Sequence, residues 1–307
     1  MNTKMLNVKP IFIVGFQRGG TNILLNLLRS HPNVCSPRGE TQEVFKGKRS
    51  TETREPFFVI ASKILKYIPI LLAQKNDLFT MKILSDHLEP SIKTMNRIDK
   101  ILYYDKLKAL GPTQNLFKEK NVKYTLDEIG NSRILLKNLN GLIFLTDMFY
   151  TMYPDATFIA IVRDGFSLAE GHIRRGADPA KAALLYEEGC KKIISDEKRI
   201  ENYHILKFED LIGDPVESLK KVYKLADLDI NMLGKIRLET TKTITNNGEH
   251  EFIHNTDNKE LLWYSLEEFA NHYNKDVNKN QRERLTKEQE EIILENAQST
   301  LQHFSYI

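Results

Sequence analysis

Continuous apolar runs and amphipathic patterns alternate along this chain. Residues 11–14 form a short run rich in β-branched side chains, which is typical of a strand buried on both faces. Thr157–Val162 is a second run of this kind. A helical pattern follows each run, beginning near Thr21 and near Phe166. This alternation of strands and helices predicts an α/β fold.

The same alternation continues through the rest of the chain. Asp214 and Pro215 have the chemistry of an N-cap and a first helical residue, and Thr286 is the expected N-cap of a last helix. The pattern also predicts a strand over residues 131–140, helices over 141–153 and 178–200, a strand starting near His204, and the last helix within 285–306.

Length and composition fit one globular unit. With 307 residues the chain is long enough for a large domain with insertions, and we predict a single domain over residues 1–307. A net charge of +3 is too small to indicate a nucleic-acid partner, because such binding depends on many phosphate contacts. Two cysteines, Cys35 and Cys190, make neither a disulfide framework nor a zinc quartet.

The most apolar stretch outside these elements covers residues 57–73. Lys63, Lys66 and Pro69 interrupt it, so it does not predict a membrane-spanning helix. A buried helical segment is the favoured interpretation, and a helix lying at a membrane surface is the alternative. The chain starts without an apolar signal segment, and we expect a cytoplasmic protein.

The glycine-containing loop after the first strand has the form of an anion site. Gly19 and Gly20 precede the helix, so several backbone N–H groups and the helix dipole can face one anion. Gly15 and Gly20 have the spacing of an ATP-binding P-loop, but Thr21 and Asn22 replace its lysine and its magnesium-binding hydroxyl. Such a loop is poorly equipped for γ-phosphoryl transfer. An ordinary glycine turn in an unrelated α/β protein is the alternative.

The sequence from Arg18 to Asn22 resembles the loop with which sulfotransferases grip the 5′-phosphosulfate of 3′-phosphoadenosine 5′-phosphosulfate (PAPS). The resemblance implies a P-loop-like three-layer sandwich, with a mostly parallel sheet and helices on both faces. It also implies in-line sulfuryl transfer from PAPS to a hydroxyl or amine, without a metal. Arg18 and the N–H groups of Gly19, Gly20, Thr21 and Asn22 would stabilise the leaving phosphate, with Arg18 acting electrostatically and not as an acid.

A second motif lies at the end of the second buried run. The stretch from Tyr153 to Asp164 resembles the sulfotransferase motif that binds the 3′-phosphate, and Arg163 is its arginine. The serine usual eight residues later is Gly171 here. Either Ser167 takes its place, or the backbone and the Arg174–Arg175 pair hold the phosphate.

The loop that follows Cys35 resembles the base-carrying loop of tyrosylprotein sulfotransferases and their bacterial relatives. Glu40 stands for the glutamate that deprotonates the acceptor, one residue later than in those relatives. A solvated loop carboxylate is the alternative for Glu40. His172 is an alternative base, and His87 is a weaker one.

Further resemblances complete the expected site. The Lys137–Asn138 pair is similar to an element that precedes the second motif in the family. Lys207 and Phe208 belong to an element that lies near the adenine in relatives. Lys259 begins a segment, ending at Trp263, that closes over the nucleotide there, although Trp263 is equally compatible with a core position.

We interpret residues 45–130 as a helical, acceptor-facing insertion. The acceptor would be a saccharide, a glycolipid or a small alcohol, and a homodimer is compatible with the pattern. The rival functions are a P-loop kinase and a catalytically silent nucleotide-binding module. The first needs a lysine where Thr21 stands.

Overall fold

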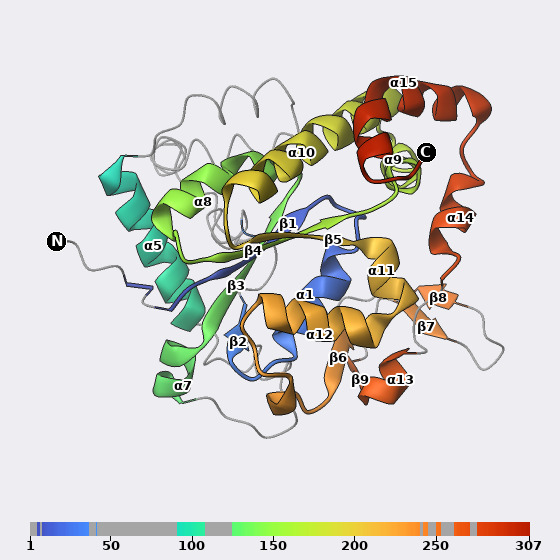
Figure 1. The fold of residues 1–307 in the computed structure, drawn as a ribbon. Helices are drawn as coiled ribbons and strands as arrows, with labels where there is room; N and C mark the ends of the chain where they lie inside the picture. Colours follow the sequence, from blue (N-terminus) through green and yellow to red (C-terminus); the bar gives the residue numbers. More distant parts are fainter. Residues whose placement is uncertain are drawn as a thin grey trace, which may run out of the picture.

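The computed structural model describes residues 5–6, 8–36, 41, 91–107, 125–239, 242–244, 250–252, 261–270 and 275–307 (Figure 1). A sheet of five parallel strands forms its centre, in the order β2-β3-β1-β4-β5. The strands are β1 (Ile11–Gly15), β2 (Val34–Cys35), β3 (Arg133–Leu139), β4 (Thr157–Val162) and β5 (Tyr203–Lys207). The predicted parallel sheet is confirmed.

The register brings the carboxyl ends of four strands to one edge. Gly15 at the end of β1 pairs with Leu139 on one side and with Ile161 on the other. Val162 pairs with Lys207 at the end of β5. All residues of β1, β3 and β4 are buried, as expected for strands covered on both faces.

Helices cover both faces of the sheet, so the predicted three-layer arrangement is also confirmed (Figure 1). One layer contains the 3₁₀ helix η3 (Asn140–Leu145), α8 (Thr146–Met152), α9 (Gly165–Ile173), α10 (Pro179–Arg199) and α15 (Lys287–His303). The opposite layer contains α1 (Thr21–Arg29), α11 (Phe208–Gly213), α12 (Pro215–Leu225) and α13 (Leu266–Ala270).

The connections from neighbouring strands leave the sheet on opposite faces. The helix after β1 packs with one core cluster, whereas the helices after β3 and β4 pack with the other. Since β1 lies between β3 and β4, its carboxyl end is the topological switch point of the sheet, where open α/β sheets bind their ligands. The loop over residues 16–20 lies at that point.

Helix caps follow the predicted chemistry. The carboxylate of Asp214 accepts a hydrogen bond from the N–H of Glu217, and Pro215 is the first residue of α12. Thr286 forms a capping box with Gln289 at the start of α15. Both predicted caps are confirmed.

Helix α5 (Ile92–Leu107) and helix α7 (Leu126–Asn131) are the described helices of the 45–130 insertion. Asp99 of α5 accepts hydrogen bonds from the backbone N–H of Met5 and from the hydroxyl of Tyr153. Lys106 donates to the carbonyl of Gly130, 2.8 Å away. These partners precede β1, β4 and β3, so α5 lies at the amino edge of the sheet. Residues 42–90 and 108–124 lie outside the described residues.

Two small antiparallel ladders follow the main sheet. Strand β6 (Ile236–Glu239) pairs with β9 (Leu261–Tyr264), and β7 (Lys242–Ile244) pairs with β8 (His250–Phe252). Trp263 of β9 is half-buried, and its ring centroid lies 5.8 Å from the guanidinium carbon of Arg237. Most of the polar 240–260 stretch lies outside the described residues.

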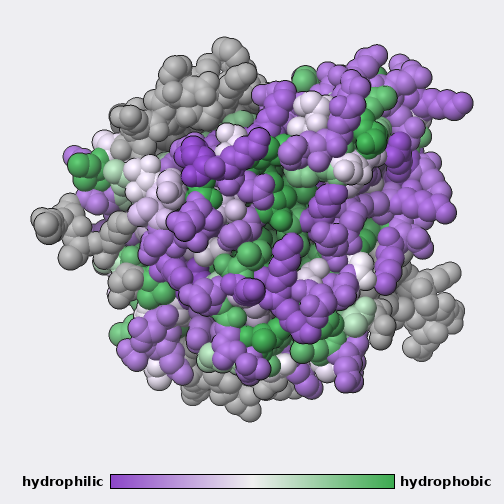
Figure 2. All heavy atoms as spheres, in the orientation of Figure 1, coloured by the Kyte–Doolittle hydropathy of each residue, from purple (hydrophilic) through white to green (hydrophobic). Residues whose placement is uncertain are grey.

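The described surface is mixed in character. Figure 2 shows hydrophilic residues over most of the visible face, with hydrophobic residues between them. Within the described ranges, no helix has the length and apolar character that crossing a membrane requires. Cys35 and Cys190 are buried free thiols.

Candidate functional site

The loop between β1 and α1 has an unusual backbone. Arg18 and Gly20 both have left-handed φ angles, of 70° and 90°. The N–H of Gly19 donates to the carbonyl of Phe16, 3.1 Å away, which closes a turn. An arginine in this conformation is uncommon and costs free energy, so its surroundings must hold it there.

The amino end of α1 faces this loop. Gly20 is its N-cap, and no side chain within the described residues caps it. The first N–H groups of a helix have no intrahelical partner, and together they carry a partial positive charge. The side chain of Arg18 is exposed beside them. This end of α1 therefore has the donors and the charge that an anionic group needs.

Gly20 allows an aromatic ring to close against the loop. A Cβ atom at this position would lie 2.3 Å from Cδ2 of Phe208, which is less than any side chain tolerates. Phe208 begins α11 directly after β5, and it is buried. Its ring centroid lies 4.4 Å from the guanidinium carbon of Arg163, within the range of a cation–π contact. Phe208 thus supports both predicted phosphate-binding elements.

Arg163 lies beside the loop, as the sequence motifs led us to expect. Its Nη1 donates to the carbonyl oxygen of Arg18, 2.7 Å away. Only 5% of Arg163 is exposed, and burial lowers its pKa, opposed mainly by the carboxylates of Glu209, Asp164 and Glu170. Arg163 therefore contacts the backbone of the loop that carries Arg18.

Helix α14 (Val277–Arg282) accepts hydrogen bonds from two further nitrogens of Arg163. The Nε group donates to Oδ1 of Asn278 at 2.8 Å, and Nη2 donates to Oε1 of Gln281. The amide nitrogens of these two residues donate in turn to Glu209 and Glu170. Two amide oxygens thus hold the edge of the guanidinium that a phosphate would use for a bidentate contact.

The two positions considered for the missing serine differ in the structure. Ser167 is fully buried, and its hydroxyl bonds to the carboxylate of Asp164 and to the carbonyl of Asn278. Gly171 lies against the loop instead, since a Cβ atom there would be 3.3 Å from Cβ and Cγ of Arg18. Because Gly171 has no side chain, the aliphatic part of Arg18 can pack against α9 at this position.

The backbone of Gln17 is held by the residue that follows β3. Its N–H donates to Oδ1 of Asn140, 3.0 Å away. Burial lowers the pKa of His172, on α9, and the nearby backbone of Gln17 opposes this shift. Nε2 of His172 is buried and has no hydrogen-bond partner within the described part of the chain.

Lys137, part of the Lys137–Asn138 motif, adds a cation beside the amino end of α1. It lies near the end of β3, is 7% exposed, and donates from Nζ to Oδ1 of Asn22 at 2.7 Å. A lysine inside a buried strand is expensive unless its charge has a use. A lysine that directly follows an apolar run within a strand is the feature of the sequence that indicates a functional role for Lys137.

Among the remaining predicted residues that the structure describes, Lys207 faces the carboxyl-terminal segment. Lys207 donates to the carbonyl of Phe304, and its ammonium lies 5.0 Å from the ring centroid of Tyr306. It therefore contacts the carboxyl-terminal segment. Glu40 and Lys259 lie outside the described residues, as does His87.

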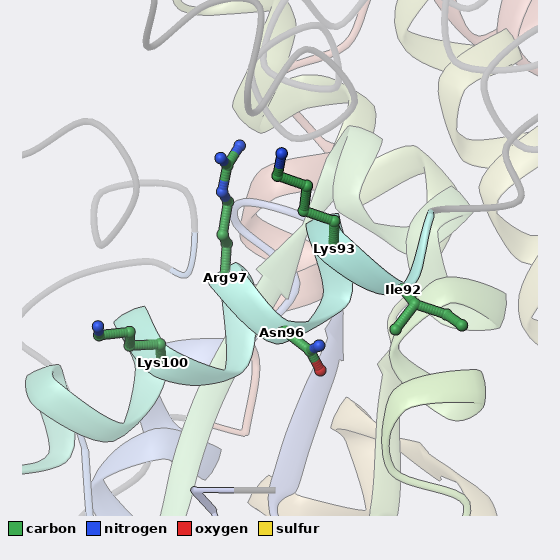
Figure 3. Close-up of a pocket in the computed structure, with 5 residues that line it drawn as sticks. All are labelled: Ile92, Lys93, Asn96, Arg97 and Lys100. Carbon is green, nitrogen blue, oxygen red and sulfur yellow. The ribbon is translucent and has the colours of Figure 1, made fainter. Parts of the chain in front are cut away.

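A separate hollow lies on α5, at the opposite edge of the sheet. Its volume is about 510 Å³, and Ile92, Lys93, Asn96, Arg97 and Lys100 line it (Figure 3). It contains none of the predicted site residues.

Fold and site together define an α/β protein with a glycine-containing anion loop at the switch point of a parallel sheet. The chain belongs to the sulfotransferase family, because the model described as "Sulfotransferase family" matches residues 10–232. No curated protein sequence matches it.

Several solved sulfotransferase structures are similar to the chain. The sulfotransferase domain of the Synechococcus PCC 7002 olefin synthase is 15% identical, with a TM-score of 0.46, over 95% of this chain and 97% of that one. STF9 from Mycobacterium avium is 15% identical, with a TM-score of 0.45, over 74% and 66%. The sulfotransferase from Alicyclobacillus acidocaldarius is 17% identical, with a TM-score of 0.36, over 72% and 82%.

Proposed function

We propose that this chain transfers the sulfuryl group of PAPS to a hydroxyl or amine and releases 3′-phosphoadenosine 5′-phosphate (PAP). The observation that carries the proposal is the 2.7 Å contact between Arg163 and the carbonyl of Arg18. It links the two cationic elements at the open amino end of α1. A nucleotide with phosphates at both ends matches this arrangement, and no metal is required by it.

The 5′-phosphosulfate end belongs at the loop in this proposal. The N–H groups of residues 20–22 and the guanidinium of Arg18 stabilise negative charge as the S–O bond to the phosphate breaks. The predicted donor at Gly19 is not among them, because its N–H bonds to the carbonyl of Phe16. Lys137 adds a second cation beside Asn22. Positive groups around the leaving phosphate lower the barrier, because negative charge on that phosphate develops in the transition state.

The 3′-phosphate belongs at Arg163. It must replace the oxygens of Asn278 and Gln281, which are neutral partners. A phosphate is a stronger partner, since charge-assisted bidentate hydrogen bonds are about twice as strong as neutral ones. Binding of the donor is therefore coupled to release of Arg163 from α14.

The acceptor loses a proton as its oxygen or nitrogen attacks sulfur. We propose that the carboxylate of Glu40 accepts this proton. The residue after it, Thr41, is buried. The bond from acceptor to sulfur forms as the bond from sulfur to the 5′-phosphate oxygen breaks. PAP leaves with the electron pair of the broken bond, and so with its negative charge. Saccharides, glycolipids and small alcohols are the proposed acceptors. The cytoplasmic location and a homodimer stay predictions.

Incubation with ³⁵S-labelled PAPS and a panel of hydroxyl and amine acceptors tests this function. We expect label in an acceptor and equimolar PAP. Glu40→Gln should lose turnover by about 100-fold or more, as expected for a general base, while PAP affinity stays unchanged. PAP binding without transfer to any acceptor class would instead support a silent nucleotide-binding module.

A further inference from the structure

The carboxylate of Glu209, in the first turn of α11, joins three separate elements beside Arg163. Its Oε1 accepts hydrogen bonds from the backbone N–H of Asp164, 3.0 Å away, and from the side-chain amide of Asn278 on α14. Its Oε2 accepts from the hydroxyl of Tyr306, 2.8 Å away. Hydrogen bonds to an ionised carboxylate are stronger than neutral ones, so these three donors hold it in one orientation.

Tyr306 reaches this carboxylate because the chain reverses direction after α15. Ser305 has a left-handed φ of 58°, and the N–H of Tyr306 donates to the carbonyl of Leu301, 2.8 Å away. Helices often end in this way, although glycine usually holds the left-handed position. The ammonium of Lys207 donates to the carbonyl of Phe304 and lies 5.0 Å from the ring centroid of Tyr306. The segment over residues 304–306 is therefore anchored at the end of β5.

The Glu209 carboxylate determines which way the amide of Asn278 faces. A side-chain amide has donors on its nitrogen and an acceptor on its oxygen. With its nitrogen on Glu209, the Asn278 amide directs its oxygen to Nε of Arg163, 2.8 Å away. The opposite orientation would place the amide oxygen against the carboxylate and the amide nitrogen against the guanidinium. Glu209 thus stabilises the contact that keeps α14 on Arg163.

We propose that Tyr306 is a positioning residue of the 3′-phosphate site, which acts through Glu209 and Asn278 on Arg163. The inference rests on the proposed PAPS function. The hydroxyl of Tyr306 fixes the carboxylate, the carboxylate fixes the amide, and the amide holds a guanidinium nitrogen that the 3′-phosphate needs. The segment over residues 304–306 therefore sets how readily the donor displaces α14.

Calorimetric titration with PAP and with adenosine 5′-phosphate tests this role, because the two ligands differ only in the 3′-phosphate. Tyr306→Phe keeps the ring beside Lys207 and removes the hydroxyl. We expect PAP to bind about threefold more tightly, since the variant loses part of one hydrogen bond that holds α14 closed. Adenosine 5′-phosphate should bind as it does to wild type. A general loosening of the fold would change both affinities alike.

A double-variant cycle tests the route through Asn278. Asn278→Ala should itself strengthen PAP binding, because it removes the acceptor on Nε of Arg163. Adding Tyr306→Phe to this variant should change PAP affinity no further, since the connection is already broken.

Tyr223→Phe is the matched control. The hydroxyl of Tyr223 donates to the carbonyl of Leu27, 2.8 Å away, near the carboxyl end of α1. Its loss removes one tyrosine hydrogen bond without touching Glu209. Both ligands should bind to this variant as they do to wild type.

Weaker PAP binding in Tyr306→Phe would overturn the inference, because the hydroxyl would then support the donor directly. Unchanged PAP affinity, or an equal change for both ligands, would also overturn it. So would an undiminished effect of Tyr306→Phe in the Asn278→Ala variant. Failure of the proposed function looks different, because the wild-type protein would then bind PAP no more tightly than adenosine 5′-phosphate.

Discussion

Arg18 and Gly171 are 153 positions apart in the chain, yet each restricts the side chain that the other position can hold. The stem of Arg18 fills the space that a side chain at position 171 would need. The family motif has a serine at this position. In this chain the aliphatic part of Arg18 lies against Gly171 instead.

Gly171→Ala should separate stability from ligand binding. Alanine favours the helix by about 1 kcal/mol over glycine, so the melting temperature should hold or rise. The added methyl displaces Arg18, and we expect PAP to bind about 3- to 10-fold more weakly, a change of about 1 kcal/mol. Thermal melting and calorimetry measure the two effects. A variant with unchanged PAP affinity would show that Arg18 does not need this place.

Acid should weaken the protein partly through His172. Burial keeps the pKa of His172 below its usual value of 6.5, so below about pH 6.5 the unfolded chain binds a proton that the folded chain refuses. Stability is therefore present above this pH and falls as the pH drops. The loss is at most about 1.4 kcal/mol per pH unit.

Melting curves of wild type and His172→Gln at pH 7.5 and pH 5.5 measure this effect. The wild-type protein should lose more of its melting temperature over this interval than the variant. Equal losses would mean that His172 titrates alike in the folded and unfolded states.

At the residue scale, the sequence predicted what its motifs carry and missed what only packing creates. Arg18 and Arg163 stand in recognisable strand–loop–helix contexts, and they do meet. Asn140 and Gln281 show no signal in the chain, because their partners are 123 and 118 residues away. A hydrogen bond of such sequence separation has no local pattern.

At the scale of elements, α14 competes with the donor. Asn278 and Gln281 hold the bidentate edge of Arg163, and carboxylates orient both amides. If the amides rotated, they would turn their oxygens toward these carboxylates, so release of the helix is the route by which a phosphate reaches the guanidinium. While α14 is bound to Arg163, the 3′-phosphate cannot reach the guanidinium. The apparent affinity for PAP is therefore proportional to the fraction of molecules in which α14 has released Arg163.

Gln281→Ala should therefore strengthen PAP binding by about fivefold, corresponding to about one hydrogen bond. Adenosine 5′-phosphate, which lacks the 3′-phosphate, should bind as it does to wild type. Asn280→Ala is the control, because Asn280 is the exposed neighbour on the same helix. Weaker PAP binding in Gln281→Ala would show that Gln281 is a phosphate ligand and not a competitor.

Elements with strong periodicity were predicted well, and short elements set by tertiary contacts were not. Strand β4 has the predicted bounds, and α10 differs from its prediction by one residue at each end. The helix expected over 141–153 is divided into η3 and α8, with Leu145 at φ −93° and ψ 9° where the two meet. Helix α11, which the sequence pattern did not predict, begins at Phe208, whose ring packs against Gly20.

At the scale of the whole molecule, the sheet separates two edges with different character. The carboxyl edge collects the loop, Arg163 and α14, whereas the amino edge carries α5 and its basic hollow (Figures 1 and 3). The parallel sheet follows from runs of buried residues that the sequence displays. The closure of α14 over Arg163 does not, because it depends on how distant elements pack.

The central claim is that Arg18 and Arg163 bind the two phosphate ends of one adenosine nucleotide. Calorimetric titration of the wild-type protein with PAP and with ATP-Mg²⁺, at equal ionic strength, tests it most directly. The account predicts that PAP binds at least about tenfold more tightly, a difference of about 1.4 kcal/mol, because the loop lacks the lysine and hydroxyl that hold a γ-phosphate and its metal. ATP-Mg²⁺ binding as tightly as PAP would contradict it.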